Sequence, residues 1–194
     1  VFNGEIYNHN DIRNKLQEVN EQLIEWNGHS DTETLLAAFE SWGIEKTLNE
    51  CVGMFAIALW DKDEETLTLA RDRLGEKPLY YGWQGNTFMF ASELKALKAH
   101  PDFTCEIDRN SLTLFLRYNY VPAPYSIYKG ISKLPSGSFV QLSISNKKLT
   151  SVTPYWSLSK IAFNGQSNPL NCNDDEAISL LENCLGSAVE EQLI

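Results

Sequence analysis

Apolar residues follow two different spacings in the first third of the chain. Ile12, Leu16 and Val19 recur at intervals of three to four residues, which predicts a helix with one buried face. Residues 52–60 are almost continuously apolar, a pattern typical of a strand covered on both faces. Residues 66–70 alternate polar and apolar, as a strand with one buried face does. We expect these two strands to pair antiparallel.

A second helix is indicated by the residues at its two ends. Ser30-Asp31-Thr32-Glu33 has the S-x-x-E form of a capping box and precedes three regularly spaced apolar residues, Leu35, Leu36 and Phe39. Gly43 is the expected stop of this helix. A short strand over Leu23 to Trp26 is expected just before it.

Shorter elements are predicted between residues 79 and 152. They are a hairpin of residues 79–83 and 87–91, a helix over 93–99, a helix through residues 112–116, and strands over 139–144 and 149–152. Ser92 and Asp108 are the expected caps of the two helices.

Residues 157–194 suggest a change of domain. Residues 157–173 are rich in Ser, Asn and Gly and have little periodicity, which predicts a linker. Asn173 or Asp174 can then cap a helix that runs to residue 194. That helix has an apolar stripe of Ile178, Leu181, Leu185, Ala188 and Val189. Too little chain remains to cover the stripe, so residues 174–194 are interpreted as the first helix of a second domain.

Composition narrows the classes of partner. The 194 residues are 43% hydrophobic, enough for a buried core, and carry a formal net charge of −10. That charge argues against nucleic acid or an anionic membrane as the main partner, because both would repel the chain. No apolar run approaches the ~20 residues that cross a bilayer, and no signal sequence opens the chain, so we expect a cytoplasmic protein.

The cysteines give no sign of a metal site or a disulfide framework. Cys51, Cys105, Cys172 and Cys184 are widely scattered and include no C-x-x-C pair, so we expect no bound metal. The chain begins with Val1 and not with Met, which indicates either processing or a piece cut from a longer protein.

Two short stretches carry residues that could do chemistry. The carboxamide of Asn3 and the backbone N–H of Gly4 are adjacent donors that could hold an oxygen that becomes negative during acyl transfer. Asn-Gly is equally a strong hairpin signal. Asp31 lies in the first turn of its helix, where exposed N–H groups and the helix dipole stabilise a carboxylate that could accept an ammonium. The simpler interpretation is that Asp31 serves the helix end alone.

Four stretches together resemble one family. The run from Asn3 to His9, Asn-Gly-Glu-Ile-Tyr-Asn-His, resembles a segment of class II glutamine amidotransferase domains, in particular those of glutamine-hydrolysing asparagine synthetases. The charged turn from Arg71 to Tyr81 and the run from Phe90 to Leu97 fit the same domains. Residues 121–156 are similar to asparagine synthetases and less so to the related enzymes that make glucosamine phosphate or phosphoribosylamine.

The resemblance implies a fold and a set of roles. The expected fold is α/β (α+β), a four-layer αββα sandwich of the N-terminal nucleophile hydrolase type with two antiparallel sheets between helices, lacking its first strands. Asn3 and Gly4 would form the oxyanion hole. Glu5 would help to hold glutamine, and Asp31, after Gly28-His29-Ser30, would bind its α-amino group. The turn 71–81 is expected to be mostly a structural ion-pair element beside the active site.

The resemblance also implies what this chain lacks. In the family a cysteine at the mature N-terminus is the nucleophile and releases ammonia from glutamine through a thioester. Val1 stands at the start instead, so we expect these 194 residues alone to be inactive. The expected domains are a partial glutaminase domain over 1–156, a linker over 157–173, and the start of a synthetase domain in the same polypeptide. ATP and Mg²⁺ would belong to that synthetase domain and not to the glutaminase domain.

The sequence is also compatible with two rival functions. The chain could be a non-catalytic regulatory paralogue, or it could belong to another ATP-dependent amidotransferase with a different acceptor. The sequence also leaves open the acceptor and whether the protein forms a homodimer.

Overall fold

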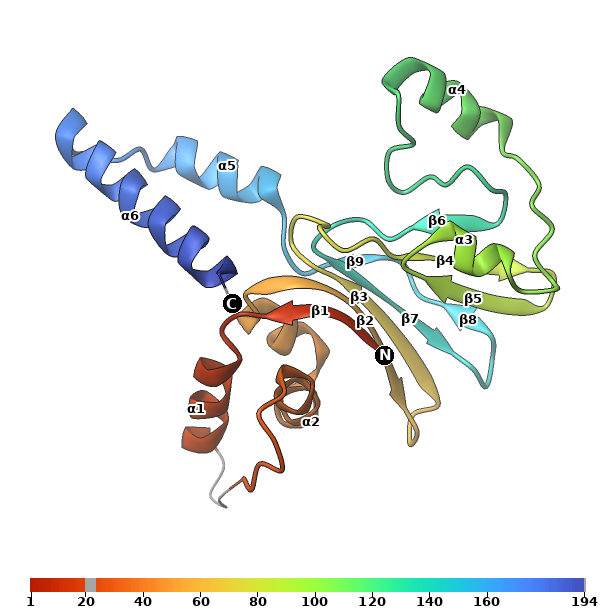
Figure 1. The fold of residues 1–194 in the computed structure, drawn as a ribbon, viewed down its shortest axis with the longest axis horizontal. Helices are drawn as coiled ribbons and strands as arrows, with labels where there is room; N and C mark the ends of the chain where they lie inside the picture. The colour runs from red at the N-terminus through yellow and green to blue at the C-terminus, as the bar shows by residue number, and fades with distance from the viewer. Residues whose placement is uncertain (20–23, 194) are drawn as a thin grey trace. The chain divides into compact units, whose positions relative to one another are not determined.

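The computed structural model describes residues 1–19 and 24–193 and has an α+β fold with two antiparallel sheets (Figure 1). The chain divides into two compact units. The first comprises Val1–Gly4 and Met54–Tyr155, and the second comprises Glu5–Gly53 and Trp156–Ile194. The domain limits expected at residues 156, 173 and 194 stay predictions.

Nearly all of the strand residues belong to the first unit. The larger sheet has the order β1-β2-β3-β7-β8, formed by Phe2–Ile6, Gly53–Asp61, Thr66–Arg71, Ser138–Ser143 and Lys148–Leu149, with β9 (Thr153–Pro154) also paired to β7. The smaller sheet has the order β5-β4-β6, formed by Thr87–Ala91, Tyr80–Gln84 and Ile131–Lys133. The antiparallel pairing of β2 with β3 and the β4–β5 hairpin are confirmed. Strand β1 lies at one edge of the larger sheet.

One hydrophobic core of this unit joins the two sheets. Ala58, Leu69 and Val140 belong to strands of the larger sheet, Tyr81 belongs to the smaller one, and all four are buried in one cluster with Leu134. The register places Leu69 opposite both Ala58 and Val140, so the apolar residues of β3 lie between those of its neighbours. Full burial of a side chain such as Leu69 or Val140 supplies roughly 1.5–3 kcal/mol.

Two short helices complete the first unit. Helix α4 (Arg109–Tyr118) begins as expected, because Asp108 accepts hydrogen bonds from the N–H groups of Asn110 and Ser111. Helix α3 (Leu94–Lys98) begins after Glu93, with no hydrogen bond from a capping side chain. The prediction that Ser92 caps this helix is therefore wrong. The Ser92 hydroxyl instead accepts a hydrogen bond from Asn3.

The second unit contains the packed helices α1 (His9–Val19) and α2 (Asp31–Glu50). Ile12 and Leu16 are fully buried, which confirms two of the three residues on the expected helix face; the Val19 side chain is not described. Ser30 caps α2 as predicted, with its side chain accepting from the N–H of Thr32 at 3.2 Å.

Two details around α2 differ from the prediction. Gly43 does not end the helix: it has φ 76°, a conformation suited to glycine, and kinks a helix that continues to Glu50. The strand expected over 23–26 falls partly outside the described residues, and Ile24, Glu25 and Trp26 form no strand.

The segment expected as an irregular linker contains a helix. Helix α5 (Leu158–Ser167) is capped by Ser157 and is followed by α6 (Asp174–Gln192). Asn173 caps α6 in a complete capping box with Glu176, one of the two caps predicted. Among the described residues neither helix has a buried side chain, and the expected apolar stripe is exposed.

Two glycines allow β1 and β2 to approach closely. Val1 and Ala58 exchange two backbone hydrogen bonds, and the N–H of Tyr7 donates to the carbonyl of Val52. Between these bonds Gly4 has φ 153° and Gly53 has φ 155°. A Cβ on Gly4 would lie 2.0 Å from the Met54 oxygen, and one on Gly53 would lie 2.1 Å from the Glu5 oxygen.

Gly53→Ala is expected to lower the free energy of unfolding by about 2–3 kcal/mol, because the new methyl group meets backbone that cannot move aside. Urea denaturation of the 194-residue chain measures the loss. Gly85→Ala is the matched control, since Gly85 also has positive φ (59°) but its added Cβ would meet no atom within 4 Å. The control should lose only about 1 kcal/mol. An equal decrease in the free energy of unfolding in both variants would contradict the explanation by a collision with the Glu5 oxygen.

Candidate functional site

The carboxamide of Asn3 is held by a serine far away in the sequence. Asn3 is exposed on β1, and its Nδ2 donates to Ser92 Oγ at 2.9 Å across 89 residues of chain. The contact lies within the first unit. A carboxamide nitrogen carries two hydrogens, so this bond fixes the group while leaving a second donor to face another oxygen.

The backbone of β1 turns alternate N–H groups in opposite directions. Val1 donates to Ala58 of β2 and Tyr7 donates to Val52, just before β2, whereas the N–H of Ile6 donates to Asp31. In an antiparallel pair this alternation directs the N–H of Gly4 away from β2, as it does that of Ile6. The Asn3 carboxamide and the Gly4 N–H are therefore two adjacent donors that do not bond to β2. Two such donors are what an oxyanion hole requires.

Asp31 is brought to the strand that carries Glu5. It is the first residue of α2, and its Oδ2 accepts from the N–H of Ile6 at 3.0 Å, within the second unit. Its Oδ1 lies 3.5 Å from the hydroxyls of Ser30 and Thr32. An ionised carboxylate offers about four acceptor positions, so an ammonium could still bind. Glu5, the neighbour of Ile6, has an exposed side chain. The structure thus places the Asp31 carboxylate at Ile6, the residue that follows Glu5 on β1.

The turn that precedes Asp31 is fixed by Arg13, which the sequence patterns did not single out, and by Glu33, which they assigned to a capping box. Arg13 donates to the carbonyls of Gly28 and Ser30, and Glu33 accepts from the N–H groups of Asn27 and Gly28. The predicted capping box is therefore wrong: Ser30 accepts from the N–H of Thr32 and not from that of Glu33, and both Glu33 oxygens bind this turn. Helix periodicity gave Arg13 no role, and no local pattern indicates that its partners lie at residues 28–34.

The charged turn after β3 is structural. Asp72 is fully buried, and its carboxylate accepts from the N–H groups of Phe55, Glu76 and Lys77 at 3.2, 2.8 and 2.9 Å. Arg71 donates to three carbonyls, those of Gly75, Lys77 and Leu134. Burial lowers the pKa of the Arg71 guanidinium. The expected ion-pair element is thus held by bonds from charged side chains to backbone.

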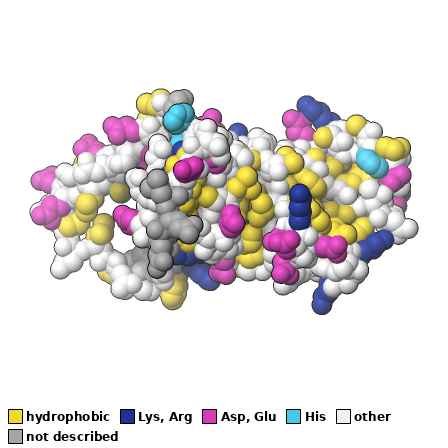
Figure 2. Space-filling view, turned by 90° about the horizontal axis from the view of Figure 1, so that it is seen from below, with side chains coloured by type: hydrophobic (Ala, Val, Ile, Leu, Met, Phe, Trp, Pro, Cys, Tyr) yellow, Lys and Arg dark blue, Asp and Glu magenta, His cyan; other side chains and the backbone are white. Residues whose placement is uncertain are grey.

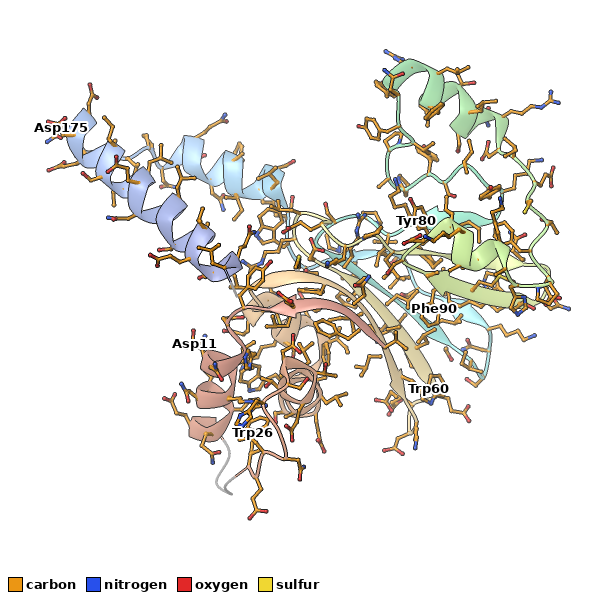
Figure 3. The ribbon with its side chains drawn as sticks, viewed as in Figure 1. Asp11, Trp26, Trp60, Tyr80, Phe90 and Asp175 are labelled. Atoms are coloured by element: carbon orange, nitrogen blue, oxygen red, sulfur yellow. The ribbon has the colours of Figure 1, made fainter. Side chains whose placement is uncertain are left out.

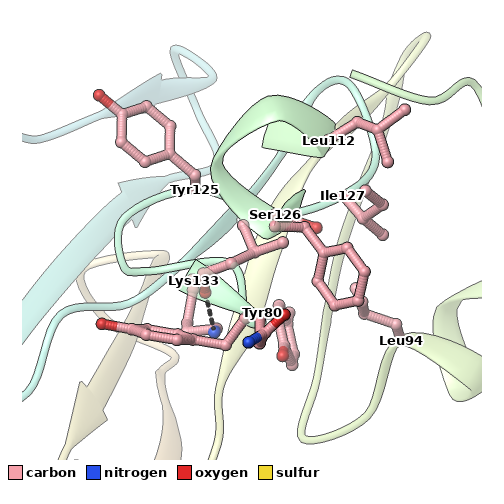
Figure 4. A pocket seen from close by; sticks show the side chains of 11 residues that line it. Tyr80, Leu94, Leu112, Tyr125, Ser126, Ile127 and Lys133 are labelled. Atoms are coloured by element: carbon pink, nitrogen blue, oxygen red, sulfur yellow. Dashed lines mark hydrogen bonds between the residues drawn. The ribbon is translucent and has the colours of Figure 1, made fainter. Parts of the chain in front are cut away.

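A cavity of about 600 Å³ opens elsewhere in the first unit (Figure 4). Leu112 and Phe115 of α4 line it together with Tyr80, Tyr125 and Lys133. The Lys133 ammonium donates to the Val121 carbonyl at 2.8 Å, and burial lowers the pKa of Lys133. None of the four predicted site residues, Asn3, Gly4, Glu5 and Asp31, lines this cavity. The cavity is therefore separate from the predicted site.

Other classes of site find little support in the part of the chain that the structure describes. Residues 1–19 and 24–193 hold no group of three His, Cys, Asp or Glu side chains placed to bind a metal. Within the same residues no helix is long and apolar enough to span a membrane. On the face seen in Figure 2, Lys and Arg side chains are scattered and do not form one continuous patch.

Comparison with known families and sequences gives matches over most of the chain. A model described as a glutamine amidotransferase domain matches residues 1–156. Asparagine synthetase [glutamine-hydrolyzing] 3 of Bacillus subtilis is 32% identical over 195 residues, covering all of this chain and 30% of the relative. The putative asparagine synthetase [glutamine-hydrolyzing] 2 of Methanocaldococcus jannaschii is 33% identical over 160 residues, covering 81% of this chain and 30% of the relative. The chain thus spans less than a third of the length of these relatives.

Comparison with solved structures supports the fold. Glutamine phosphoribosylpyrophosphate amidotransferase from B. subtilis, in complex with ADP and GMP, aligns with a TM-score of 0.53 at 16% identity. The alignment covers 81% of this chain and 29% of that one. At this level of identity the similarity concerns the arrangement of sheets and helices.

Proposed function

Because the chain belongs to the glutamine amidotransferase domain family, we propose that it is the glutamine-hydrolysing part of an asparagine synthetase. In the full-length polypeptide it would release ammonia from glutamine for the ATP-dependent amidation of aspartate. The names of the relatives support this acceptor, and their greater length leaves room for a synthetase domain. ATP and Mg²⁺ would act in that second domain.

One observation carries the proposal for the site. Asp31 lies beside β1, where its carboxylate is held by the N–H of Ile6 and keeps acceptor positions for a further donor. An α-ammonium group needs such an acceptor, and Glu5, the residue before Ile6, supplies a second carboxylate. We assign Asp31 to the α-amino group of glutamine and Glu5 to holding the same substrate.

The remaining roles concern the reaction itself. Asn3 Nδ2 and the N–H of Gly4 would stabilise the oxyanion that forms when a thiolate attacks the glutamine amide. The proposal places the nucleophilic cysteine before Val1 in the same polypeptide. Loss of ammonia from the tetrahedral intermediate would leave a thioester, and water would hydrolyse it to glutamate.

Asp31→Asn in the full-length polypeptide is expected to raise KM for glutamine by about 10- to 100-fold, because a hydrogen bond to a charged group contributes roughly 1.5–3 kcal/mol. Ammonia release measured against glutamine concentration gives KM and kcat. Asp175→Asn makes the same change in the first turn of another helix, α6, and should leave both constants unchanged (Figure 3).

Two results of this assay would contradict the proposal. An unchanged KM in Asp31→Asn would remove the residue from the substrate site. The absence of glutamine hydrolysis in the unmodified full-length polypeptide would favour a non-catalytic paralogue.

A further inference from the structure

A single arginine joins helix α1 to the turn before Asp31. The Arg13 Nε donates to Thr34 Oγ1 at 2.7 Å, Nη1 donates to the Gly28 carbonyl at 2.9 Å, and Nη2 donates to the Ser30 carbonyl at 3.1 Å. All of these atoms belong to the second unit. Its guanidinium therefore bonds to residues on both sides of Asp31 in the sequence.

The surroundings of the guanidinium restrict it to this position. The Arg13 side chain is only 12% exposed, and its Cζ lies 4.3 Å from the centroid of the Trp26 ring. Figure 3 labels this ring next to α1 and α2. A guanidinium stacked on an aromatic face while donating in its own plane has few alternative rotamers.

Glu33 binds the same turn as an acceptor, whereas Arg13 binds it as a donor. Its Oε1 accepts from the N–H of Asn27 at 2.8 Å, and its Oε2 accepts from that of Gly28 at 3.0 Å. The hydrogen bond from Asn27, followed by that from Gly28 and the charge of Arg13, lowers the pKa of Glu33. Arg13 thus binds the carbonyls of the turn, while Glu33 binds its N–H groups.

We propose that Arg13 is a positioning residue for Asp31: it fixes the turn 27–30 and the start of α2, and thereby the carboxylate that binds substrate. This inference rests on the function proposed above for Asp31. Arg13 itself would not touch glutamine, since its donors are directed to Thr34, Gly28 and Ser30. Its loss should weaken substrate binding and leave the acyl-transfer chemistry at Asn3 and Gly4 intact.

The chemistry of the group explains why arginine stands here. The planar guanidinium offers five N–H donors in a fixed fork. Each of its three nitrogens donates to a different acceptor. A lysine ammonium is a compact point charge that cannot reach all three acceptors from one place. Arg13→Lys should therefore show a defect of the same kind as Arg13→Ala.

The test is steady-state ammonia release from glutamine by the full-length polypeptide. Arg13→Ala is expected to raise KM roughly 10-fold with kcat within about twofold, as a misplaced binding group does. Lys15→Ala is the matched control, because Lys15 is a cation on the same helix whose ion pair with Glu50 lies away from the turn. It should leave both constants unchanged.

A double variant separates positioning from a purely structural role. In the Asp31→Asn background, Arg13→Ala should raise KM no more than about twofold further, because the group that it positions no longer binds the ammonium. A structural role would instead lower the fraction of active enzyme, and therefore the apparent kcat, equally in both backgrounds. Full additivity of the two KM effects would overturn the inference.

The remaining outcomes are also decisive. If Asp31→Asn raises KM while Arg13→Ala does not, the inference fails and the proposed function stands. If Asp31→Asn has no effect, the proposed role of Asp31 fails and the inference fails with it. If Arg13→Ala does not fold, Glu33→Gln tests the same turn: a rise in KM at constant kcat supports the inference, and an unchanged KM overturns it.

Discussion

Asn3→Ala in the full-length polypeptide is expected to lower kcat for glutamine hydrolysis by about 10²–10³-fold, with KM for glutamine nearly unchanged. The carboxamide would bond to the oxygen of the substrate amide only once that oxygen becomes negative, so its removal affects the transition state and not the bound substrate. Ammonia release at saturating glutamine measures the loss.

Three comparisons give this result its meaning. Asparagine formation from added ammonium should be unchanged, because ammonium bypasses glutamine hydrolysis. Asn14→Ala removes an exposed carboxamide from α1 and should have no effect. Ser92→Ala should lower kcat by a smaller factor, because it frees the Asn3 carboxamide without removing it. An Asn3→Ala enzyme that keeps its kcat and loses only affinity would exclude the oxyanion role.

Asp72→Ala is expected to lower the free energy of unfolding by about 3–5 kcal/mol. The change leaves the N–H groups of Phe55, Glu76 and Lys77 without their acceptor at a fully buried site. These groups belong to β2 and to the turn after β3, so the substitution should destabilise the pairing of β2 with β3 in the larger sheet. Urea denaturation of the 194-residue chain, followed by tryptophan fluorescence, measures it.

The control for Asp72 is an acidic residue on the surface. Asp63→Ala, in the exposed turn between β2 and β3, should change the free energy of unfolding by less than about 0.5 kcal/mol. Asp72→Asn should fall between the two, since an amide oxygen can still accept from part of the N–H set. A loss below about 1 kcal/mol in Asp72→Ala would show that the turn rearranges to satisfy its own backbone.

The elements that could be predicted from the sequence are those whose signals are local. The β4–β5 hairpin follows from Gly85-Asn86 between apolar runs, and the starts of α2, α4 and α6 follow from Ser30, Asp108 and Asn173. Each depends on a few adjacent residues. The kink at Gly43 was missed because a glycine near the end of an apolar pattern has the same signal whether the helix stops or bends.

The candidate site was predictable only in part for the same reason. Asn3, Gly4, Glu5 and Asp31 were selected by their resemblance to known motifs. The residues that hold them lie far along the chain: Ser92 is 89 residues from Asn3, and Arg13 is 17 residues from Ser30, the neighbour of Asp31. Such pairings depend on the register of β1 and on the packing of α1 against α2, which no local pattern specifies. Ser92 was assigned to a helix cap because that is the usual role of a serine before a helix.

The close approach at Gly4 affects how any saturation mutagenesis of this protein should be interpreted. Every side chain at this position would collide with the Met54 oxygen, so all nineteen replacements should reduce the amount of folded protein. A selection for growth without asparagine would then score Gly4 as intolerant whether or not its N–H stabilises an oxyanion. Semisynthesis that replaces this one amide by an ester removes the N–H and adds no Cβ, and would separate the two contributions.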